Sequence, residues 1–338
     1  GTAGPVVVNP QGSNLPPGLV AGLAAAPPGA AAALEVDEAW LGAAADALAP
    51  VTITLLNLSR DQLDRTAEVR RLADRWRGVA ATTTAAVVAN ADDPLVTWAA
   101  CAAADVTWVA AGQPWTDDAT GCPSCGGAIT FAPTGWRCSD CDFARPTPAF
   151  RLDGDMLRDD RGEPHAIALS LPGRANRSNA AMAAATARRL GVAVGTGLEA
   201  MAAMTAVDGR YRRVRVDGSD ARLLLAKNPA GWLEVFDMLD PAPGAVVVVI
   251  NARIADGRDP SWLWDVPFER LTGRPVAASG ERSRDLAVRL HYARVEHHRI
   301  PDPVDAIRAL GPGRVDVAAN YTALRDLDAR LRRGLPRG

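Results

Sequence analysis

Val51-Thr-Ile-Thr-Leu-Leu56 is a short apolar run that is followed by a longer amphipathic segment at residues 60–76. The same pair of elements repeats further along the chain, with an apolar run at residues 85–89 and a second amphipathic segment at residues 95–104. A chain that alternates strands and helices in this way is typical of a parallel sheet with helices on both of its faces. These residues therefore predict the α/β fold class for this part of the chain.

The alternation resumes after residues 208–210, which favours a second, Rossmann-like α/β domain. Its expected strands are residues 223–226, 245–250, 276–278 and 315–319. A chain of 338 residues also has the length of two domains, at roughly 100 to 200 residues each. We therefore predict one domain at residues 1–207 and another at residues 208–338, with the break near Val207. Because the chain opens with Gly1 and reaches the strand-like residues 5–8 at once, we expect it to begin within a domain.

The charge balance argues against overall electrostatic attraction of the protein to a nucleic acid or an anionic membrane. Lys and Arg number 37, Asp and Glu number 39, and the resulting net charge of −2 creates no overall positive field. The longest clean apolar run, residues 98–104, is far shorter than the ~18 to 20 residues that span a bilayer. No signal-peptide pattern opens the chain. We expect a cytoplasmic protein with no transmembrane segment and no nucleic-acid partner.

Two Cys-x-x-Cys pairs give the most specific local signal. Cys122-Pro-Ser-Cys125 is followed after twelve residues by Cys138-Ser-Asp-Cys141. Each short turn delivers two thiolates to one side of a metal ion, as a zinc ribbon requires, whereas two disulfides or a redox pair are the alternatives. We predict a ribbon inserted at about residues 117–146 that binds a structural Zn²⁺, because four thiolates leave no open coordination position. The fifth cysteine, Cys101, lies in an apolar stretch and is expected to be a buried core thiol.

Lys227 is the only lysine of the chain, and arginine supplies the other 36 of the 37 basic residues. Such a skew indicates that arginine has replaced lysine wherever a positive charge alone was needed. A compact ammonium can approach a phosphate or a carboxylate as a point charge, which a planar guanidinium cannot do in the same way. Lys227 is therefore a candidate functional residue, and the alternative is a chance survivor on a solvated surface.

Acidic residues follow three of the apolar runs. They lie in Glu35-Val-Asp37-Glu38, in Asn57-Leu-Ser-Arg-Asp-Gln-Leu-Asp-Arg65 and in Asn90-Ala-Asp-Asp-Pro94. Ligands collect at the carboxyl ends of strands in open α/β sheets, and Mg²⁺ prefers carboxylate oxygen. These segments together favour a magnesium site, whereas Asp and Asn at each one also suit helix caps and turns.

Six segments together carry a resemblance to a known family. In chain order they are Asn57-Leu-Ser-Arg-Asp-Gln-Leu-Asp-Arg65, Asn90-Ala-Asp-Asp-Pro94, Gly173-Arg-Ala-Asn-Arg-Ser-Asn179, Ala226-Lys-Asn-Pro-Ala-Gly231, Ala255-Asp-Gly-Arg-Asp-Pro-Ser-Trp-Leu-Trp-Asp265 and Asn320-Tyr-Thr-Ala323. With a four-cysteine ribbon between the second and the third, the chain resembles the MurT family, the synthetase subunits of lipid II isoglutaminyl synthase. The resemblance covers essentially the whole chain and implies the ATP-binding central domain and the C-terminal domain of the Mur ligases.

The resemblance also implies an activity and its partners. MurT proteins activate the α-carboxylate of D-glutamate in the lipid II stem peptide with ATP, as an acyl phosphate, and ammonia captures it to give D-isoglutamine. The ammonia comes from glutamine, which a separate amidotransferase subunit, GatD, hydrolyses. The expected cofactors are therefore ATP and Mg²⁺ beside the structural Zn²⁺, and the expected substrate is lipid II at the membrane surface.

Individual residues match positions with roles in that family. Glu35 matches an acidic residue that holds Mg²⁺, and Asn176 and Asn179 match the asparagine motif that lies against adenine. Two carboxamides three residues apart on one helical face can read the edge of a base. Lys227 would face the γ-phosphate or the acyl phosphate, where an ammonium stabilises developing negative charge.

The loop at residues 256–265 corresponds to the segment of MurT that meets the glutaminase and supplies an acidic residue to its Cys-His pair. A carboxylate that orients a histidine follows the logic of a catalytic triad, and Asp256 or Asp259 is favoured for this role. The loop departs from the family pattern in two places. Ala252 stands after Asn251 where the family has Asp, and Pro260 replaces an apolar residue.

The phosphate-binding pattern GxxxxGK followed by Ser or Thr is absent from the chain. The family carries such a loop just upstream of where this chain begins, so we expect this chain alone to bind ATP poorly. Two alternatives therefore remain beside amidation: a muramyl or folate-type ligase that adds an amino acid, and a zinc-ribbon binding protein without ATP chemistry. The reading frame upstream of Gly1 is the simplest observation that would separate them.

Overall fold

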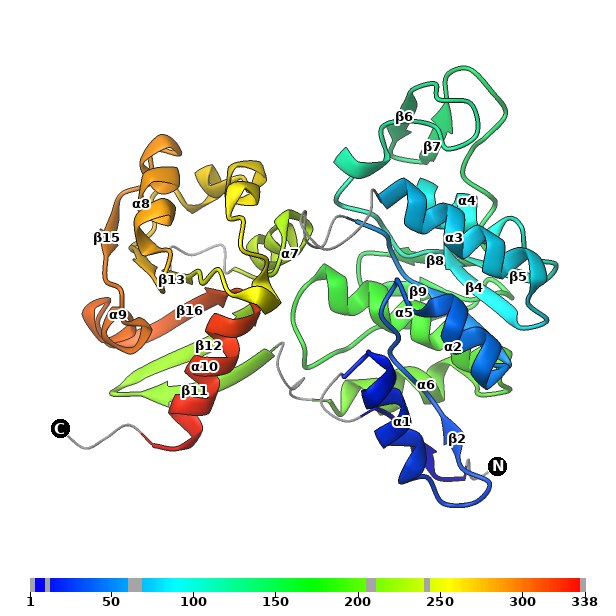
Figure 1. The fold of residues 1–338 in the computed structure, drawn as a ribbon, viewed down its shortest axis with the longest axis horizontal. Coiled ribbons are helices and arrows are strands. Elements are labelled where there is room, and N and C mark those ends of the chain that lie inside the picture. The colour runs from blue at the N-terminus through cyan, green and yellow to red at the C-terminus, as the bar shows by residue number, and fades with distance from the viewer. Residues whose placement is uncertain (1–3, 10–12, 60–68, 205–210, 240–243, 335–338) are drawn as a thin grey trace. The chain divides into compact units, whose positions relative to one another are not determined.

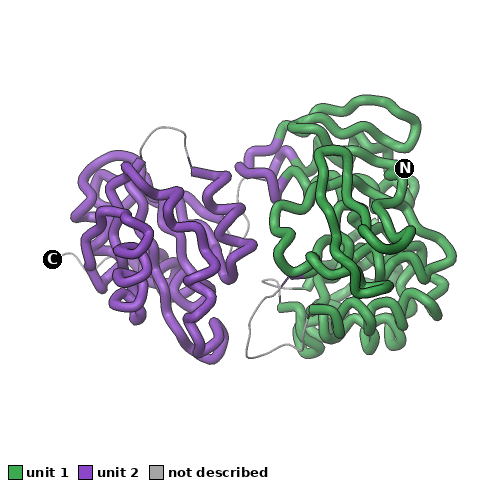
Figure 2. The backbone as a smooth tube through the Cα atoms, turned by 90° about the horizontal axis from the view of Figure 1, so that it is seen from above, with its two compact units in different colours: residues 1–58, 67–168, 177–201 green, residues 59–66, 169–176, 202–338 purple. Residues whose placement is uncertain are grey.

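A computed structural model describes residues 4–9, 13–59, 69–204, 211–239 and 244–334 (Figure 1). The chain divides into two compact units, which Figure 2 shows in different colours. Unit 1 comprises residues 1–58, 67–168 and 177–201, and unit 2 comprises residues 59–66, 169–176 and 202–338. The boundary predicted at residues 207 and 208 lies outside the described residues.

The main sheet of unit 1 has six strands in the order β10-β9-β8-β5-β4-β3. Its parallel part consists of β3 (Thr52–Leu55), β4 (Ala86–Asn90), β5 (Val106–Ala110) and β8 (Phe150–Asp153). β9 (Met156–Arg158) and β10 (Pro164–Ala166) extend the sheet as an antiparallel meander. β3 and β4 occupy the two apolar runs from which the parallel sheet was predicted.

Helices cover both faces of this sheet. α3 (Val69–Thr82) and α4 (Pro94–Ala100) share one hydrophobic core with the inward side chains of β3 and β4, among them Ile53 and Leu55. Side chains alternate along a strand, so Thr54 faces the opposite side, where its Oγ1 lies 2.8 Å from Oγ1 of Thr186 in α5 (Arg174–Arg189). The predicted parallel sheet with helices on both faces is confirmed. Residues 60–68, where the helix before Trp76 was expected to start, lie outside the described residues.

Further elements of unit 1 lie near the chain's start and after α5. β1 (Val6–Val7) pairs in parallel with β2 (Ala31–Ala32) in a separate two-stranded sheet. α1 (Pro16–Ala24) connects these two strands, and α2 (Leu41–Leu48) precedes β3. α6 (Val194–Ala202) follows α5. None of the helices in the described part of the chain combines the length and apolar character that crossing a bilayer demands.

The main sheet of unit 2 also has six strands, in the order β11-β12-β16-β13-β14-β15. The parallel strands are β12 (Ser219–Leu225), β13 (Ala245–Val249), β14 (Val276–Ser279), β15 (His297–Arg299) and β16 (Gly313–Ala319), and β11 (Tyr211–Val216) is an antiparallel edge strand. The four strands predicted for this part of the chain correspond to β12, β13, β14 and β16. The second α/β sheet is thereby confirmed.

Two hydrophobic cores enclose this second sheet. α7 (Pro229–Met238) and α8 (Ser283–Tyr292) contribute to the core on one face, and α9 (Pro303–Ala309) and α10 (Tyr321–Arg332) to the core on the other. β13 reads Ala-Val-Val-Val-Val because Val246 and Val248 enter the first core while Val247 and Val249 enter the second. Three short 3₁₀ helices, η3 (Ile254–Asp256), η4 (Ser261–Asp265) and η5 (Phe268–Leu271), follow β13.

A buried ion pair joins two strands of this sheet. Arg222 of β12 and Asp316 of β16 are register partners, and each side chain is only 3% exposed. Nε and Nη2 of Arg222 lie 2.5 and 2.8 Å from the two carboxylate oxygens of Asp316. Nη2 also donates to the carbonyl of Met238, the last residue of α7, at 3.0 Å. Removing either charge would leave the other buried without a counterion.

We predict that Asp316→Asn lowers the free energy of unfolding of unit 2 by about 3 to 5 kcal/mol, because Arg222 then stays buried and unpaired. Asp217→Asn is the matched control, since Asp217 pairs with Arg308 at the surface, where the side chains are 55% and 42% exposed. That control should cost less than about 1 kcal/mol. Urea unfolding measures both variants, and equal losses would contradict the prediction.

Candidate functional site

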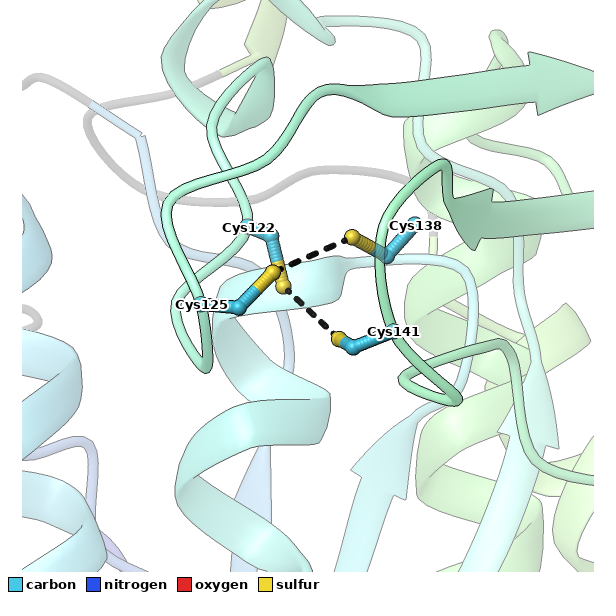
Figure 3. Close-up of side chains that lie close together, drawn as sticks. All are labelled: Cys122, Cys125, Cys138 and Cys141. Carbon is cyan, nitrogen blue, oxygen red and sulfur yellow. Dashed lines mark hydrogen bonds between the residues drawn. The ribbon is translucent and has the colours of Figure 1, made fainter.

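The four predicted zinc ligands converge on a small hairpin of unit 1 (Figure 3). β6 (Ile129–Ala132) and β7 (Gly135–Cys138) form this hairpin in the connection between β5 and β8. Cys122 and Cys125 precede β6, Cys138 ends β7, and Cys141 lies in the turn that follows. We call residues 117–146 the ribbon.

The sulfur atoms have the spacing of a tetrahedral metal site. Sγ of Cys122 lies 3.7 Å from Sγ of Cys141, Sγ of Cys125 lies 3.5 Å from Sγ of Cys138, and all four atoms lie within 4.8 Å of one another. Zn–S bonds of about 2.3 Å place sulfurs about 3.8 Å apart around a tetrahedral ion. All four cysteines are free thiols, and their surroundings fit a metal-bound thiolate. Backbone N–H groups of Ser124, Gly127 and Asp140 donate to these sulfurs at 3.3 to 3.4 Å.

Cys101 corrects one sequence-based expectation, because this thiol is exposed rather than buried. Its Sγ accepts a hydrogen bond from Nη1 of Arg77 at 2.9 Å and donates to the carbonyl of Trp98 at 3.3 Å. Helix α4 ends at Ala100, so Cys101 is its C-cap and follows the residues that pack on the sheet. The apolar composition of residues 98–104 therefore does not mean that each of these residues is buried.

Asp93, in the acidic segment after β4, caps helix α4. Its Oδ1 accepts hydrogen bonds from the backbone N–H groups of Leu95 and Val96 at 2.8 and 3.1 Å. Its Oδ2 accepts from the backbone of Leu58 and from the side chain of Gln113, both at 2.8 Å. Burial raises the pKa of Asp93 to about 6, while the backbone donors act in the opposite direction. The sequence left two alternatives for the acidic residues of this segment, a magnesium site and a helix cap. Asp93 is a helix cap.

We call residues 90–94 the strand-end loop, and its other polar side chains bind the turn after β5. Oδ2 of Asp92 accepts a hydrogen bond from the backbone of Gly112 at 2.7 Å, and Nδ2 of Asn90 donates to the Gly112 carbonyl at 3.0 Å. Gly112 has a φ of +87°, which favours glycine. Asp92 also forms an ion pair of 2.6 Å with Arg145 of the ribbon. The strand-end loop is thus held by the neighbouring strand connection and by the ribbon.

Glu35, the predicted Mg²⁺ ligand, follows β2 and has an exposed side chain. The buried Asn9 fixes the backbone of Glu35. Its Oδ1 accepts from the Glu35 N–H at 2.9 Å, and its Nδ2 donates to the Glu35 carbonyl at 2.9 Å. An exposed carboxylate on a fixed backbone can bind a hard cation that also contacts a substrate phosphate.

Asn176 and Asn179, the residues predicted to bind adenine, lie in the first two turns of α5. Nδ2 of Asn176 donates to the carbonyl of Pro172 at 2.6 Å, and Asn179 is exposed. Between them, the hydroxyl of Ser178 donates to the carbonyl of Ala111, next to Gly112. Their spacing of three residues places both asparagines on one side of the helix.

Two carboxylates of α7 hold the first turn of α5. Asp237 accepts from the backbone N–H of Arg174 at 2.8 Å, and Glu234 accepts from the backbone N–H of Ala175 at 3.0 Å. Glu234 also forms an ion pair of 3.1 Å with Arg174. Burial raises the pKa of Glu234, and the charge of Arg174 opposes that shift. These acids satisfy free N–H groups of the helix and favour its positive end, which fixes the turn that carries Asn176.

Lys227 lies half-buried between the end of β12 and the start of α7. The next residue, Asn228, is the N-cap of α7, and its Oδ1 accepts from the backbone N–H of Gly231 at 2.8 Å. Because β12 runs parallel to β16, Lys227 lies at the carboxyl edge of the parallel sheet. Ligands bind at this edge in α/β folds.

The two aspartates favoured for the partner-facing loop have different surroundings. Asp256 is 6% exposed, and its carboxylate accepts from the backbone N–H of Thr322 at 2.8 Å and from the Thr322 hydroxyl. Asp259 is exposed, and its carboxylate accepts from the backbone N–H and the hydroxyl of Ser261, both at 2.9 Å. Asp256 therefore ties the loop to α10, whereas Asp259 presents a carboxylate at the surface.

Sequence reasoning missed a buried polar network at the carboxyl edge of unit 2. The backbone N–H of Asn251 donates to Oδ1 of Asn320 at 3.1 Å, and Nδ2 of Asn320 donates to the Asn251 carbonyl at 2.7 Å. Nδ2 of Asn251 lies 3.3 Å from the hydroxyl of Thr322, and its Oδ1 accepts from the backbone of Glu281 at 3.1 Å. The sequence signal that could have indicated this network is an asparagine directly after each of two apolar runs, at residues 245–250 and 315–319.

Comparison with known proteins agrees with this architecture. The family model that describes the C-terminal part of MurT ligases matches residues 225–324. The subunit MurT of the glutamine-hydrolysing lipid II isoglutaminyl synthase of Streptococcus pneumoniae is 30% identical over 319 residues, which cover 85% of this chain and 70% of that protein. The chain belongs to the MurT family. The resemblance read from the six sequence segments is therefore confirmed.

Solved structures place the MurT fold among the Mur ligases. A pseudomurein peptide ligase type C from Methanothermus fervidus matches with a TM-score of 0.71 at 14% identity, over 90% of this chain and 68% of that one. MurF from Acinetobacter baumannii matches with a TM-score of 0.67 at 14% identity, over 97% of this chain and 71% of that one. The predicted Mur ligase-like fold is confirmed, and at these identities the likeness concerns the fold alone.

We predict that the protein contains about one Zn²⁺ per chain, because the four sulfurs complete a closed tetrahedral site. Replacing Cys122 and Cys138 together by Ser should abolish zinc binding and destabilise the ribbon. Cys101→Ser is the control and should keep the full zinc content. Metal analysis after purification under reducing conditions without chelators measures this, and finding no zinc in the unmodified protein would refute the site.

Proposed function

We propose that this chain is the synthetase subunit of a lipid II isoglutaminyl synthase, which amidates the α-carboxylate of D-glutamate in the lipid II stem peptide. The observation that carries this proposal is the 30% identity to a protein of that name over 85% of the chain. The Mur ligase fold supports it, since that fold belongs to enzymes named as peptide ligases. Such a subunit works in the cytoplasm on a substrate at the membrane surface.

In the proposed reaction, ATP with Mg²⁺ supplies the phosphoryl group that activates the substrate carboxylate. Transfer of the γ-phosphoryl group to the carboxylate oxygen releases ADP. The lone pair of ammonia then forms the new C–N bond, the nitrogen loses one proton, the C–O bond to the phosphoryl group breaks, and phosphate leaves with the electron pair of that bond. Lys227 is the residue of this chain suited to the phosphate charge, because it extends from the carboxyl edge of a parallel sheet directly before the capped helix α7. An ammonium there stabilises charge that develops on the transferred or departing phosphate.

The residues for the nucleotide and its metal are proposed from their chemistry and position. The exposed carboxylate of Glu35 offers oxygen to Mg²⁺. Asn176 and Asn179 offer carboxamides that can both donate to and accept from an adenine edge. The zinc of the ribbon takes no part in this chemistry, because four thiolates leave no position for substrate or water.

The ammonia is proposed to come from a glutaminase subunit of the GatD type. Glutamine hydrolysis needs a nucleophilic cysteine with a positioned histidine. Four of the five cysteines lie in the ribbon cluster, and Cys101 contacts Arg77 and the Trp98 carbonyl instead of a histidine. A partner therefore has to supply the nucleophile.

Asp259 is the better candidate to complete that partner's active site. Both oxygens of Asp256 bind Thr322 inside unit 2, so this carboxylate is not presented to another protein. Asp259 is exposed, and among the described residues its carboxylate binds Ser261 of the same loop. We assign Asp256 to the stability of the loop and Asp259 to the orientation of a partner histidine.

We predict that Lys227→Arg lowers the amidation rate by about 100-fold while the fold is kept, because the guanidinium is bulkier and places its charge differently. The assay contains ATP, lipid II and the glutaminase partner, and is repeated with an ammonium salt in place of glutamine. Loss in both assays places the defect in the synthetase step, and circular dichroism checks the fold.

Arg308→Lys is the matched control for this exchange, because the ion pairs of Arg308 in the described part of the chain, with Asp217 and Asp305, lie at the surface. It should leave amidation unchanged. Full activity of Lys227→Arg would show that amidation does not need the lysine, and that Lys227 is only a solvated surface residue. Incorporation of an amino acid in place of ammonia by the unmodified protein would favour the ligase alternative.

We predict that Asp259→Asn lowers the glutaminase activity of the complex by at least about tenfold and leaves the complex assembled, because the swap keeps the shape but removes the charge that orients a histidine. Glutamate release and co-elution of the two subunits measure the two properties. Amidation driven by an ammonium salt should stay unchanged, since that step needs no glutaminase.

Asp265→Asn, an exposed aspartate of the same loop, is the control and should keep glutaminase activity. Asp256→Asn should instead lower the free energy of unfolding of unit 2, because the buried hydrogen bonds to Thr322 are weakened. A fully active Asp259→Asn complex would show that the loop only docks the partner.

A further inference from the structure

The ribbon contacts the strand-end loop through two side chains that the proposed chemistry does not use. Nε1 of Trp136, a residue only 4% exposed, donates to the carbonyl of Ala91 at 2.9 Å. Arg145 forms an ion pair of 2.6 Å with Asp92. Trp136 precedes the zinc ligand Cys138 by two residues on β7, so the two side chains lie on the same face of that strand. The strand that carries a metal ligand therefore also carries the contact to the loop.

Aromatic packing joins the same part of the ribbon to helix α4. The ring of Phe143 lies 5.0 Å from the ring of Trp136 and 6.1 Å from that of Trp98 in α4. The Phe143 carbonyl accepts from the backbone N–H of Cys138 at 2.8 Å. Residues around the metal thus hold the ribbon against the helix that begins at Pro94, at the end of the strand-end loop.

The contacts continue from the strand-end loop to α5. Asp92 and Asn90 bind the N–H and the carbonyl of Gly112 at 2.7 and 3.0 Å. The carbonyl of the preceding residue, Ala111, accepts from the hydroxyl of Ser178. Ser178 directly precedes Asn179 in α5. A continuous series of contacts within unit 1 therefore leads from the zinc ligands to the helix that carries a proposed adenine-binding residue.

We infer that the zinc-bound ribbon positions the strand-end loop and the part of α5 around Ser178 that belongs to unit 1, so that zinc binding and nucleotide binding stabilise each other, with Trp136 and Arg145 as positioning residues. The nucleotide part of this inference rests on the proposed function. Coupling between two sites is reciprocal, so a ribbon that favours nucleotide binding must itself hold zinc more firmly when nucleotide is bound. A ribbon that only adds stability to the surface of unit 1 would show no such effect.

The first experiment measures hydrogen exchange in the full, zinc-loaded chain, in peptides that cover residues 86–93, 109–113 and 177–182. Trp136→Phe keeps the ring and removes the donor to Ala91, and it should speed exchange in these peptides by about fivefold, the effect of one lost hydrogen bond. Trp76→Phe is the matched control, because the buried indole of Trp76 also donates to a backbone carbonyl, that of Glu38 at 2.9 Å, outside this series of contacts.

Arg145→Gln is the second variant and should speed exchange in the same peptides, because it breaks the ion pair with Asp92 and leaves Trp136 in place. Metal analysis must find the full zinc content in each variant. If zinc-loaded Trp136→Phe and Arg145→Gln both exchange like Trp76→Phe, the ribbon does not position the loop and the inference is wrong. This experiment needs no ATP chemistry, so it stays decisive even if the proposed function fails.

The second experiment measures the zinc affinity of the protein by equilibrium competition with a chromophoric chelator, with and without a saturating amount of Mg²⁺ and ATP. Nucleotide should raise the zinc affinity of the unmodified protein about fivefold, a typical coupling between two sites, and should have a smaller effect in Trp136→Phe. Direct titration with a fluorescent ATP analogue establishes that nucleotide is bound. Bound nucleotide that leaves the zinc affinity unchanged would overturn the coupling. Because this chain alone is expected to bind ATP poorly, absence of nucleotide binding contradicts the proposed function only in a protein that carries the phosphate-binding loop of the family.

Discussion

Parallel strands end together at one edge of a sheet, so the backbone groups of every connection that follows must find partners within a small space. In unit 1 the fully buried carboxylate of Asp93 meets this constraint by accepting four hydrogen bonds. It binds the first turn of α4, the backbone after β3 at Leu58 and the side chain of Gln113 after β5. Asp93 therefore joins the start of α4 to the connections that follow β3 and β5.

Unit 2 meets the same constraint mainly with neutral amides. Asn251 and Asn320 exchange hydrogen bonds between side chain and backbone, which joins the ends of β13 and β16. Gly280 lets the next connection approach closely, because a Cβ there would lie 2.5 Å from the carbonyl oxygen of Ile250. Asp256 joins this network through Thr322. Asp256 is buried and holds the loop to α10, whereas Asp259 of the same loop is exposed, which is why Asp259 is the residue proposed to face a partner.

The parts of the fold that the sequence predicted are those that depend on local spacing. A strand such as β13 is recognisable because both faces are buried and every position is apolar. The ribbon is recognisable because each pair of ligands comes from one short turn. Cys101 was misread because its exposure depends on where α4 ends, and the amides of Asn251 and Asn320 were missed because their partners come from a distant strand. The roles of Glu35, Asn176 and Lys227 depend on a bound nucleotide and stay predictions.

The ribbon shows why an insertion of this size needs both a metal and a host. Its apolar cluster is small and consists mainly of Ile129, Trp136, Phe143 and the cysteines, too little to fold independently without a metal. A buried indole also needs an acceptor, and Trp136 finds it in the Ala91 carbonyl of the strand-end loop. A metal held by the four cysteines would order one side of the ribbon, and the strand-end loop completes the other. This contact is made at the carboxyl end of β4, at the edge of the sheet where ligands collect, and the proposed coupling between the ribbon and a bound nucleotide rests on it.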